Sequence, residues 1–233
     1  MLYNFEKTLL VILLSITFSC KNYNNENHYR NFAIVTAKYE ATKAGHKILK
    51  MGGNAFDAMI ATDLALSVVY PNAGNLGGGG FMVYRTSNSQ YGSIDYREKA
   101  PLLSSENMYL DKNGNIIKNL SREGSLSIGV PGTVAGLFEV YEKFGTLPLD
   151  SIFKPALELA RDGFKLTKKQ ADLFNSSKSK ILINSDSLSL FNKNFEKDMI
   201  FSNDKLYKTL KYLLKNGVEA VSYTHLRAHE TNW

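Results

Sequence analysis

The residues best suited to binding or catalysis form a polar cluster, DYREKAP, at positions 95–101. Arg97 stands out within this cluster, because a guanidinium holds a carboxylate through two parallel hydrogen bonds, a geometry that lysine cannot reproduce. The alternative is that Arg97 pairs with Asp95 or Glu98 in a solvated surface cluster, which would contribute little. On the residue types alone, the surface cluster is the simpler interpretation.

A glycine-rich stretch, GNLGGGGF, occupies positions 74–81. A phosphate-binding P-loop would require lysine at position 80, and Leu76 and Met82 break the two registers of the dinucleotide-binding fingerprint. Consecutive glycines permit close backbone approach. Two interpretations therefore stay open: tight packing against a neighbouring helix, or one wall of a substrate pocket. The glycines concerned are Gly77, Gly78, Gly79 and Gly80.

The remaining candidates for a nucleophile or base are weak. The sequence contains no Gly-x-Ser-x-Gly elbow, so there is no hydrolase serine to name. The stretch GVPGTVAG at 129–136 predicts a turn into a helix whose small residues allow close packing, so Thr133 is not a nucleophile candidate. We expect His28 and His46 at the surface.

The elements around these segments must bring them together. Apolar runs bounded by turn residues predict strands at 81–85 and 91–95, joined as a hairpin, with Arg97 just beyond the second strand. Helical spacing predicts helices at 41–51 and 55–69, the second nearly apolar all round and capped by Asn54. Strands and helices mix without a βαβ repeat, which indicates an α+β fold or a layered sandwich. Further predicted elements are a β-type run at 32–37, helices that start at Pro131 and at caps Ser151 and Asp204, and a polar surface insertion at 175–203.

Composition excludes several classes of protein. The 233 residues are enough for one domain with a tail, and a hydrophobic content of 44% excludes a disordered chain. The single cysteine excludes a disulfide framework and a multi-cysteine zinc site. The net charge of +6 comes from scattered lysines and arginines, so we expect no nucleic-acid partner.

Residues 1–20 are typical of an export signal. Lys7 precedes the apolar stretch 8–18, which is too short to cross a bilayer as a helix. Cys20 follows in the arrangement of a bacterial lipoprotein signal, in which that cysteine is lipidated; an ordinary secretory signal is the alternative. The polar, Asn-rich residues 21–31 predict a flexible tether. In both cases we expect an exported protein, in the periplasm or at the cell surface.

Residues 221–233 differ abruptly in composition and resemble one reading frame of a transposon-end adapter. His225 and His229 lie four residues apart beside Glu230, but not in the order His-Glu-x-x-His, so they predict no metal site. We therefore expect 221–233 to be an artefactual tail. The natural sequence at 32–220 is then a fragment of a longer protein.

Several blocks, in order along the chain, resemble the large subunit of γ-glutamyltranspeptidase (γ-glutamyltransferase). The resemblance covers about 32–220. After NGVEA at 216–220 the family would continue Phe-Tyr-x-Gly, whereas this chain enters the adapter-like tail. The matching blocks are GGNAFDA at 52–58, GNLGGGGFM at 74–82, DYREKAP at 95–101, VPGTVAG at 130–136, KPA at 154–156 and LARDGF at 159–164.

The resemblance implies an Ntn-hydrolase αββα sandwich, here an incomplete α+β fold without its small-subunit half. It implies a precursor that cleaves itself, and a nucleophilic threonine at the new N-terminus of the small subunit, beyond residue 220. The expected reaction transfers the γ-glutamyl group of glutathione to water, an amino acid or a dipeptide, with no cofactor. Arg97 matches the arginine that binds the α-carboxylate of the glutamyl group, so the resemblance favours the binding role.

The resemblance also implies partners: glutathione or other γ-glutamyl compounds, the missing small subunit, and a membrane if Cys20 is lipidated. Two rival functions remain at this point. One is a non-catalytic surface lipoprotein that binds a small anionic ligand. The other is a purely structural surface protein, for which Arg97 would have no binding role.

Overall fold

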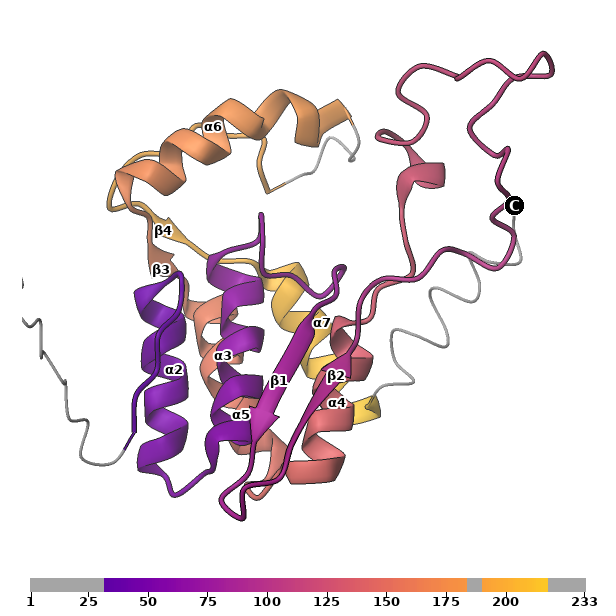
Figure 1. Cartoon of the computed structure of the whole chain (residues 1–233). Coiled ribbons are helices and arrows are strands. Elements are labelled where there is room, and N and C mark those ends of the chain that lie inside the picture. The colour runs from indigo at the N-terminus through magenta and orange to yellow at the C-terminus, as the bar shows by residue number, and fades with distance from the viewer. Residues whose placement is uncertain (1–31, 184–189, 218–233) are drawn as a thin grey trace, which may run out of the picture. The chain divides into compact units, whose positions relative to one another are not determined.

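A computed structural model describes residues 32–183 and 190–217 (Figure 1). The chain divides after Ala33, and the elements below all belong to the unit that begins at Ile34. The expected export signal, Cys20, the tether and the adapter-like tail lie outside the described residues. Within the described part, no helix is both long and apolar enough to cross a membrane.

Helices form the larger part of the fold. Helix α3 contacts α2, α4 and α5, and α7 packs against α5 (Figure 1). Ten residues of α3 are buried, as its nearly continuous apolar sequence predicts. The helices are α2 (Tyr39–Lys50), α3 (Ala55–Val69), α4 (Thr133–Phe144), α5 (Leu149–Asp162), α6 (Lys168–Ile183) and α7 (Asp204–Asn216), with a 3-10 turn η1 (Ser125–Ser127).

The main strands form the predicted hairpin. Strand β1 (Phe81–Arg85) pairs antiparallel with β2 (Tyr91–Asp95), and Phe81 lies opposite Asp95. One face of the hairpin turns its side chains into the core, where Met82 and Ile94 are buried. The opposite face is open: Phe81 is 65% exposed and Val83 84% exposed. The second sheet is small and pairs β3 (Phe164–Lys165) with β4 (Ile200–Phe201).

The start of α3 is tied to the turn after α4 by a buried carboxylate. Asn54 caps α3 as predicted, and its backbone N–H donates to Asp57 Oδ2 at 3.0 Å, which completes a capping box. Asp57 is fully buried and also accepts from the backbone N–H of Thr146 at 2.9 Å and from its hydroxyl at 2.5 Å. These bonds join segments about 90 residues apart in sequence.

Four helix starts differ from the predictions, and one predicted strand is wrong. Helix α2 begins at Tyr39 rather than at 41, and α4 begins at Thr133 rather than at Pro131. Helix α5 begins at Leu149 behind Pro148, a turn earlier than the predicted Ser151 cap, and the Ser151 N–H donates to the Pro148 carbonyl at 2.9 Å. The cap of α7 is Asn203, whose side chain accepts from Leu206 N, one residue before the predicted Asp204. The run at 32–37 forms no strand, because no other described strand pairs with it.

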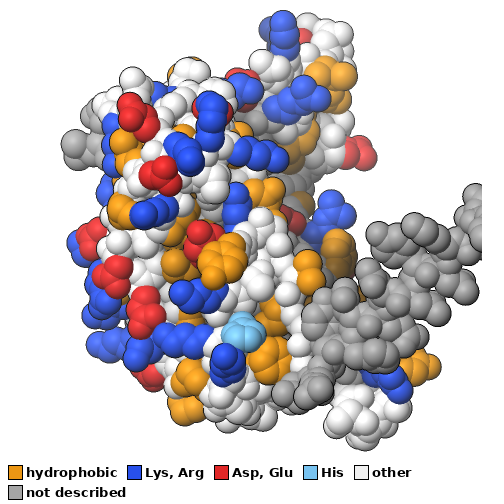
Figure 2. All heavy atoms as spheres, turned by 90° about the vertical axis from the view of Figure 1, so that its left-hand side faces the viewer, with side chains coloured by type: hydrophobic (Ala, Val, Ile, Leu, Met, Phe, Trp, Pro, Cys, Tyr) orange, Lys and Arg blue, Asp and Glu red, His pale blue; other side chains and the backbone are white. Residues whose placement is uncertain are grey.

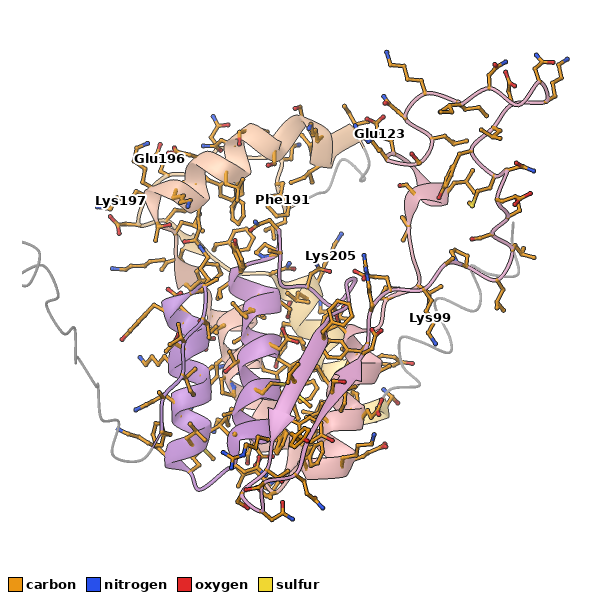
Figure 3. The ribbon with its side chains drawn as sticks, viewed as in Figure 1. Lys99, Glu123, Phe191, Glu196, Lys197 and Lys205 are labelled. Carbon is orange, nitrogen blue, oxygen red and sulfur yellow. The ribbon has the colours of Figure 1, made fainter. Side chains whose placement is uncertain are left out.

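The predicted polar surface insertion at 175–203 is also wrong. Helix α6 continues through Ile183, and an aromatic cluster follows it, with Phe191 lying beneath α6 in Figure 3. Phe174, Phe195 and Phe201 are each buried to within a few per cent of full burial. The rings contact one another with centroids 5.1 to 5.8 Å apart. The many lysines and asparagines between them obscure this apolar pattern in the sequence.

Charges are interspersed on the surface. On the face that carries α2, lysine and arginine side chains alternate with aspartate and glutamate rather than gathering in one patch (Figure 2). Several of these charges are paired: Lys47 with Glu158 across α2 and α5, and Lys168 with Asp172 within α6. Such exposed pairs contribute little to stability individually.

Candidate functional site

The backbone on both sides of Arg97 is fixed by hydrogen bonds. Gly80 and Tyr96 continue the hairpin ladder, with N···O distances of 3.3 and 3.0 Å. Beyond Arg97, Lys99 and Val130 form an antiparallel bridge with N···O distances of 3.1 and 2.8 Å. Arg97 therefore lies in a short span of chain anchored to the glycine-rich stretch before it and to the approach to α4 after it.

The glycine-rich stretch also caps α4. The carbonyl oxygen of Gly78 accepts from the backbone N–H groups of Gly132 and Thr133, at 2.9 and 3.1 Å. Both N–H groups lie at the start of α4, where a helix has no internal acceptors for them. One glycine carbonyl therefore holds the helix start beside the segment that carries Arg97.

Glycine is required at these positions because backbones approach too closely for a side chain. A Cβ atom on Gly79 would lie 2.6 Å from the Tyr96 carbonyl oxygen and 2.7 Å from the Glu98 nitrogen. Cβ atoms on Gly132 and Gly136 would overlap Tyr96 as well. Gly79 and Gly80 therefore pack tightly, but against the segment 96–98 rather than against a helix, whereas a Cβ on Gly77 would meet only the Asn75 side chain. The pocket-wall interpretation stays a prediction. The small-residue interpretation of 129–136 is confirmed in the same way, and Thr133 is buried.

Arg97 is exposed and its side chain is not in the expected surface cluster. Within residues 32–183 and 190–217, its guanidinium makes no salt bridge with Asp95 or Glu98. Asp95 instead turns back, and its Oδ1 accepts from the backbone N–H of Arg97 at 2.9 Å. The guanidinium carbon lies 6.0 Å from the centre of the Phe81 ring. The charged group therefore stays available for an anion from outside the described chain.

A half-buried acid, Asp63, lies close to Tyr96 in the same segment. Burial raises the pKa of the Asp63 carboxyl on α3. The pKa of the Tyr96 phenol is also raised, by burial and then by the negative charge of Asp63. Tyr96 precedes Arg97 directly, and its ring lies against Gly80 and Gly136. The inner side of the Arg97 segment is therefore closely packed and carries the Asp63 carboxyl and the Tyr96 phenol, and its outer side is open.

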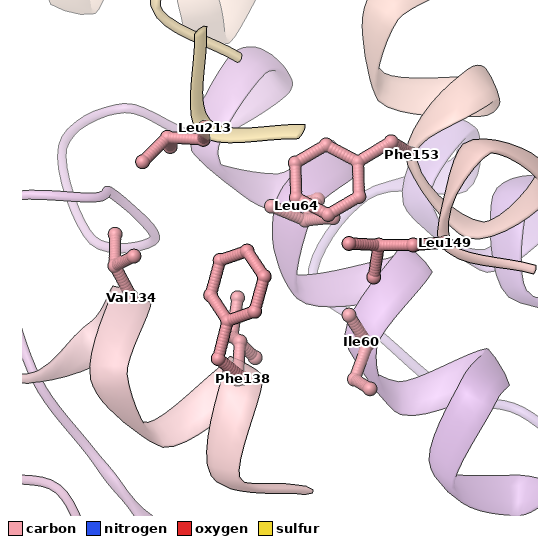
Figure 4. A pocket seen from close by; sticks show the side chains of 8 residues that line it. Ile60, Leu64, Val134, Phe138, Leu149, Phe153 and Leu213 are labelled. Carbon is pink, nitrogen blue, oxygen red and sulfur yellow. The ribbon is translucent and has the colours of Figure 1, made fainter. Parts of the chain in front are cut away.

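Three hollows in the described part of the chain lie away from Arg97. An apolar space of about 10 Å³ among α3, α4, α5 and α7 is lined by eight side chains without a polar group (Figure 4). A space of that size without polar partners is a packing defect and holds no ligand. Two larger depressions, of about 720 and 530 Å³, lie along α5 and α7 and along α2 and α5, and Arg97 lines neither.

Other predicted features fall as follows. His46 is exposed on α2, as expected, and His28 lies outside the described residues. Among the residues that the structure describes, no group of three or more His, Cys, Asp or Glu side chains is arranged to hold a metal ion. His225 and His229 lie outside that part.

A family model for γ-glutamyltranspeptidase matches residues 41–229. The chain belongs to the γ-glutamyltranspeptidase family. The glutathione hydrolase proenzymes of Pseudomonas sp. (strain A14) and Escherichia coli (strain K12) are 43% and 42% identical over 178 and 181 residues. These matches cover 74% and 76% of this chain but 31% of each relative, so the chain spans about a third of their length. The family match extends into 221–233, whose adapter origin stays a prediction.

Solved structures of the family share the fold. γ-Glutamyltranspeptidase from Helicobacter pylori superposes with a TM-score of 0.80 at 35% identity, covering 86% of this chain and 59% of that chain. The enzyme from Pseudomonas nitroreducens, complexed with L-DON, gives 0.76 at 33% identity, with the same coverage. The expected Ntn-hydrolase fold, present here as a partial α+β domain, is confirmed.

The sequence indicated Arg97 and the glycines but missed the residues that hold them. Tyr96 fills the space that Gly80 and Gly136 leave open, and Phe81 lies beside the guanidinium. A usable signal was present: Phe81 and Arg97 flank the hairpin ladder at positions that alternate to the same face.

Proposed function

We propose that this chain is the large-subunit part of an exported γ-glutamyltransferase that also acts as a glutathione hydrolase. Its role is to bind the glutamyl end of the donor through Arg97, whose guanidinium pairs with the α-carboxylate. The observation that carries the proposal is the guanidinium of Arg97, which pairs with no acid within the described residues and is held on an anchored segment in a member of this family. The surface-cluster alternative is disfavoured because Asp95 is bonded to the backbone instead.

The proposed chemistry needs a nucleophile that this chain does not supply. A threonine hydroxyl at the N-terminus of the small subunit attacks the γ-carbonyl carbon, the amide bond breaks, and the amine leaves with a proton. Water or an amino group then attacks the acyl-threonine ester and releases the threonine. Arg97 acts before these steps by fixing the far end of the glutamyl group, so that the γ-carbonyl is presented in one orientation. We therefore expect the chain alone to be inactive.

Export is part of the same proposal. Residues 1–20 would direct the precursor out of the cytoplasm, and lipidation of Cys20 would leave the domain on a tether of residues 21–31. The enzyme would then act on γ-glutamyl compounds in the periplasm or at the cell surface. Mass spectrometry of the mature N-terminal peptide tests the assignment: a diacylglyceryl group on Cys20 supports it, and cleavage elsewhere contradicts it.

The experiment that tests the binding role is Arg97→Lys in the complete protein, expressed from the uninterrupted gene. Lysine keeps the charge but loses the two parallel hydrogen bonds, so we expect KM for a γ-glutamyl donor to rise about 10-fold or more. The melting temperature should not change, because the side chain is exposed. Arg85→Lys is the matched control, since Arg85 is exposed on the same hairpin and bonds only to Ser89 in the described chain. An unchanged KM in Arg97→Lys contradicts the proposal.

The open face of the hairpin allows a second test, which asks whether a small-subunit layer normally covers this face. Phe81, Val83 and Tyr91 are all at least 65% exposed on one face of a two-stranded sheet whose edges pair with no other described strand. Such a surface promotes association. We expect the isolated 233-residue chain to associate in sedimentation velocity, and Val83→Lys with Tyr91→Lys to reduce it. A monodisperse monomer with a sharp cooperative melt would contradict a missing small-subunit layer.

A further inference from the structure

An aromatic ring, that of Phe81, lies exposed beside the Arg97 guanidinium. Phe81 opens β1, and its partner in the hairpin is Asp95, so Phe81 and Asp95 lie on the same face of the sheet. Residues two apart in an extended chain share a face, which places Arg97 on that side too. The ring is 65% exposed, and the guanidinium carbon of Arg97 lies 6.0 Å from its centre.

The Phe81 ring covers one side of the Arg97 guanidinium and limits its movement toward that side. The backbone beneath it is fixed by Gly80 and by the Lys99–Val130 bridge, and no described acid competes for the charge. A ring next to a guanidinium attracts it through the negative face of the π-system and removes water from one side. The remaining open side is where a carboxylate would bind, and a partly desolvated guanidinium binds it more strongly.

We infer that Phe81 is a positioning residue for Arg97: its ring holds the guanidinium in the orientation that receives the donor's α-carboxylate. The inference rests on the proposed function and adds to it a residue outside the cluster that carries Arg97. The competing account is that Phe81 only awaits burial under a covering layer. The two accounts differ in which substitutions are tolerated, because burial requires apolar volume and positioning requires an aromatic face.

The test uses the complete protein and separates these requirements. Phe81→Leu keeps apolar volume and removes the π-system, and we expect KM for a γ-glutamyl anilide to rise about threefold with kcat unchanged. Phe81→Tyr keeps the aromatic face and should restore the KM of the unsubstituted protein. Val35→Ala is the control for an exposed apolar side chain: Val35 is 92% exposed and lies outside the hairpin, so KM should stay the same.

A second donor substrate distinguishes a loss of positioning from a general loss of folded enzyme in Phe81→Leu. The 4-aminobutanoyl anilide lacks the α-carboxylate, so Phe81→Leu should leave its kcat/KM unchanged while lowering that of the γ-glutamyl anilide. Equal losses with both donors, or full activity in Phe81→Leu, would overturn the inference. If Arg97→Lys raises KM and Phe81→Leu does not, the proposed function stands and only this inference fails. If Arg97→Lys has no effect, both fail together.

Discussion

Replacing Gly79 by alanine should destabilise the fold by about 3 kcal/mol, because the new methyl group meets backbone rather than a movable side chain. Its Cβ would lie 2.6 to 2.8 Å from Tyr96 O, Glu98 N and Arg97 Cα. Relief requires the whole Arg97 segment to move away from the glycine-rich stretch. In the complete protein the same change should therefore raise KM for the donor as well. Urea unfolding followed by far-UV circular dichroism measures the stability of the 233-residue chain.

Gly77 in the same stretch is the matched control. Its Cβ position meets only the Asn75 side-chain oxygen at 3.4 Å, an ordinary contact. Alanine there restricts the unfolded chain without a clash, so Gly77→Ala should be neutral or stabilise by up to about 1 kcal/mol. Equal destabilisation by both substitutions would mean that the glycines serve flexibility in general and not the approach of residues 96–98.

Asp57→Ala should have the other large effect, a loss of about 4 kcal/mol in the free energy of unfolding. The substitution leaves the backbone N–H of Asn54 and both donors of Thr146 without their acceptor. These bonds are charge-assisted and their acceptor is fully buried, although Asn54 is half-buried and Thr146 is exposed, so the substitution removes them and leaves a cavity at the carboxylate. The start of α3 should detach from the turn after α4, and the midpoint of urea unfolding should fall accordingly.

Asp172→Asn provides the contrast for Asp57. The two carboxylate oxygens of Asp172 accept hydrogen bonds from the Lys168 amine at 3.1 and 3.0 Å, but both side chains are exposed. An exposed pair of this kind contributes about 0.5 kcal/mol or less. A similar small loss in Asp57→Ala would show that the buried contacts of Asp57 do not hold the two segments together.

Local signals were sufficient for the elements next to the site. The hairpin strands and helix 55–69 have the bounds that the sequence predicts, because turn residues and the Asn54 cap mark their ends. The strand predicted at 32–37 failed because a strand also needs a partner, and partner choice is not local. The aromatic cluster after α6 was missed because its rings are distant in sequence and separated by polar residues.

The site itself was only partly predictable. Arg97 could be singled out by residue type, but its availability depends on Asp95 turning back to the backbone, which no spacing rule predicts. The function of the glycines depends on contacts of Gly79 and Gly132 with Tyr96. Tyr96 is far from α4 along the sequence, so no local pattern indicates these contacts. Phe81 reads as an ordinary strand residue until its distance to the guanidinium is known.

The most direct measurement is a thermodynamic cycle between Arg97 and the α-carboxylate of the donor. It compares kcat/KM of the complete protein and of Arg97→Ala on a γ-glutamyl anilide and on the 4-aminobutanoyl anilide, which lacks that carboxylate. We expect Arg97→Ala to lower kcat/KM for the first donor about 100-fold and to change the second by less than about threefold. Losses of equal size on both donors would mean that Arg97 does not bind the carboxylate, and the functional assignment of this residue would be wrong.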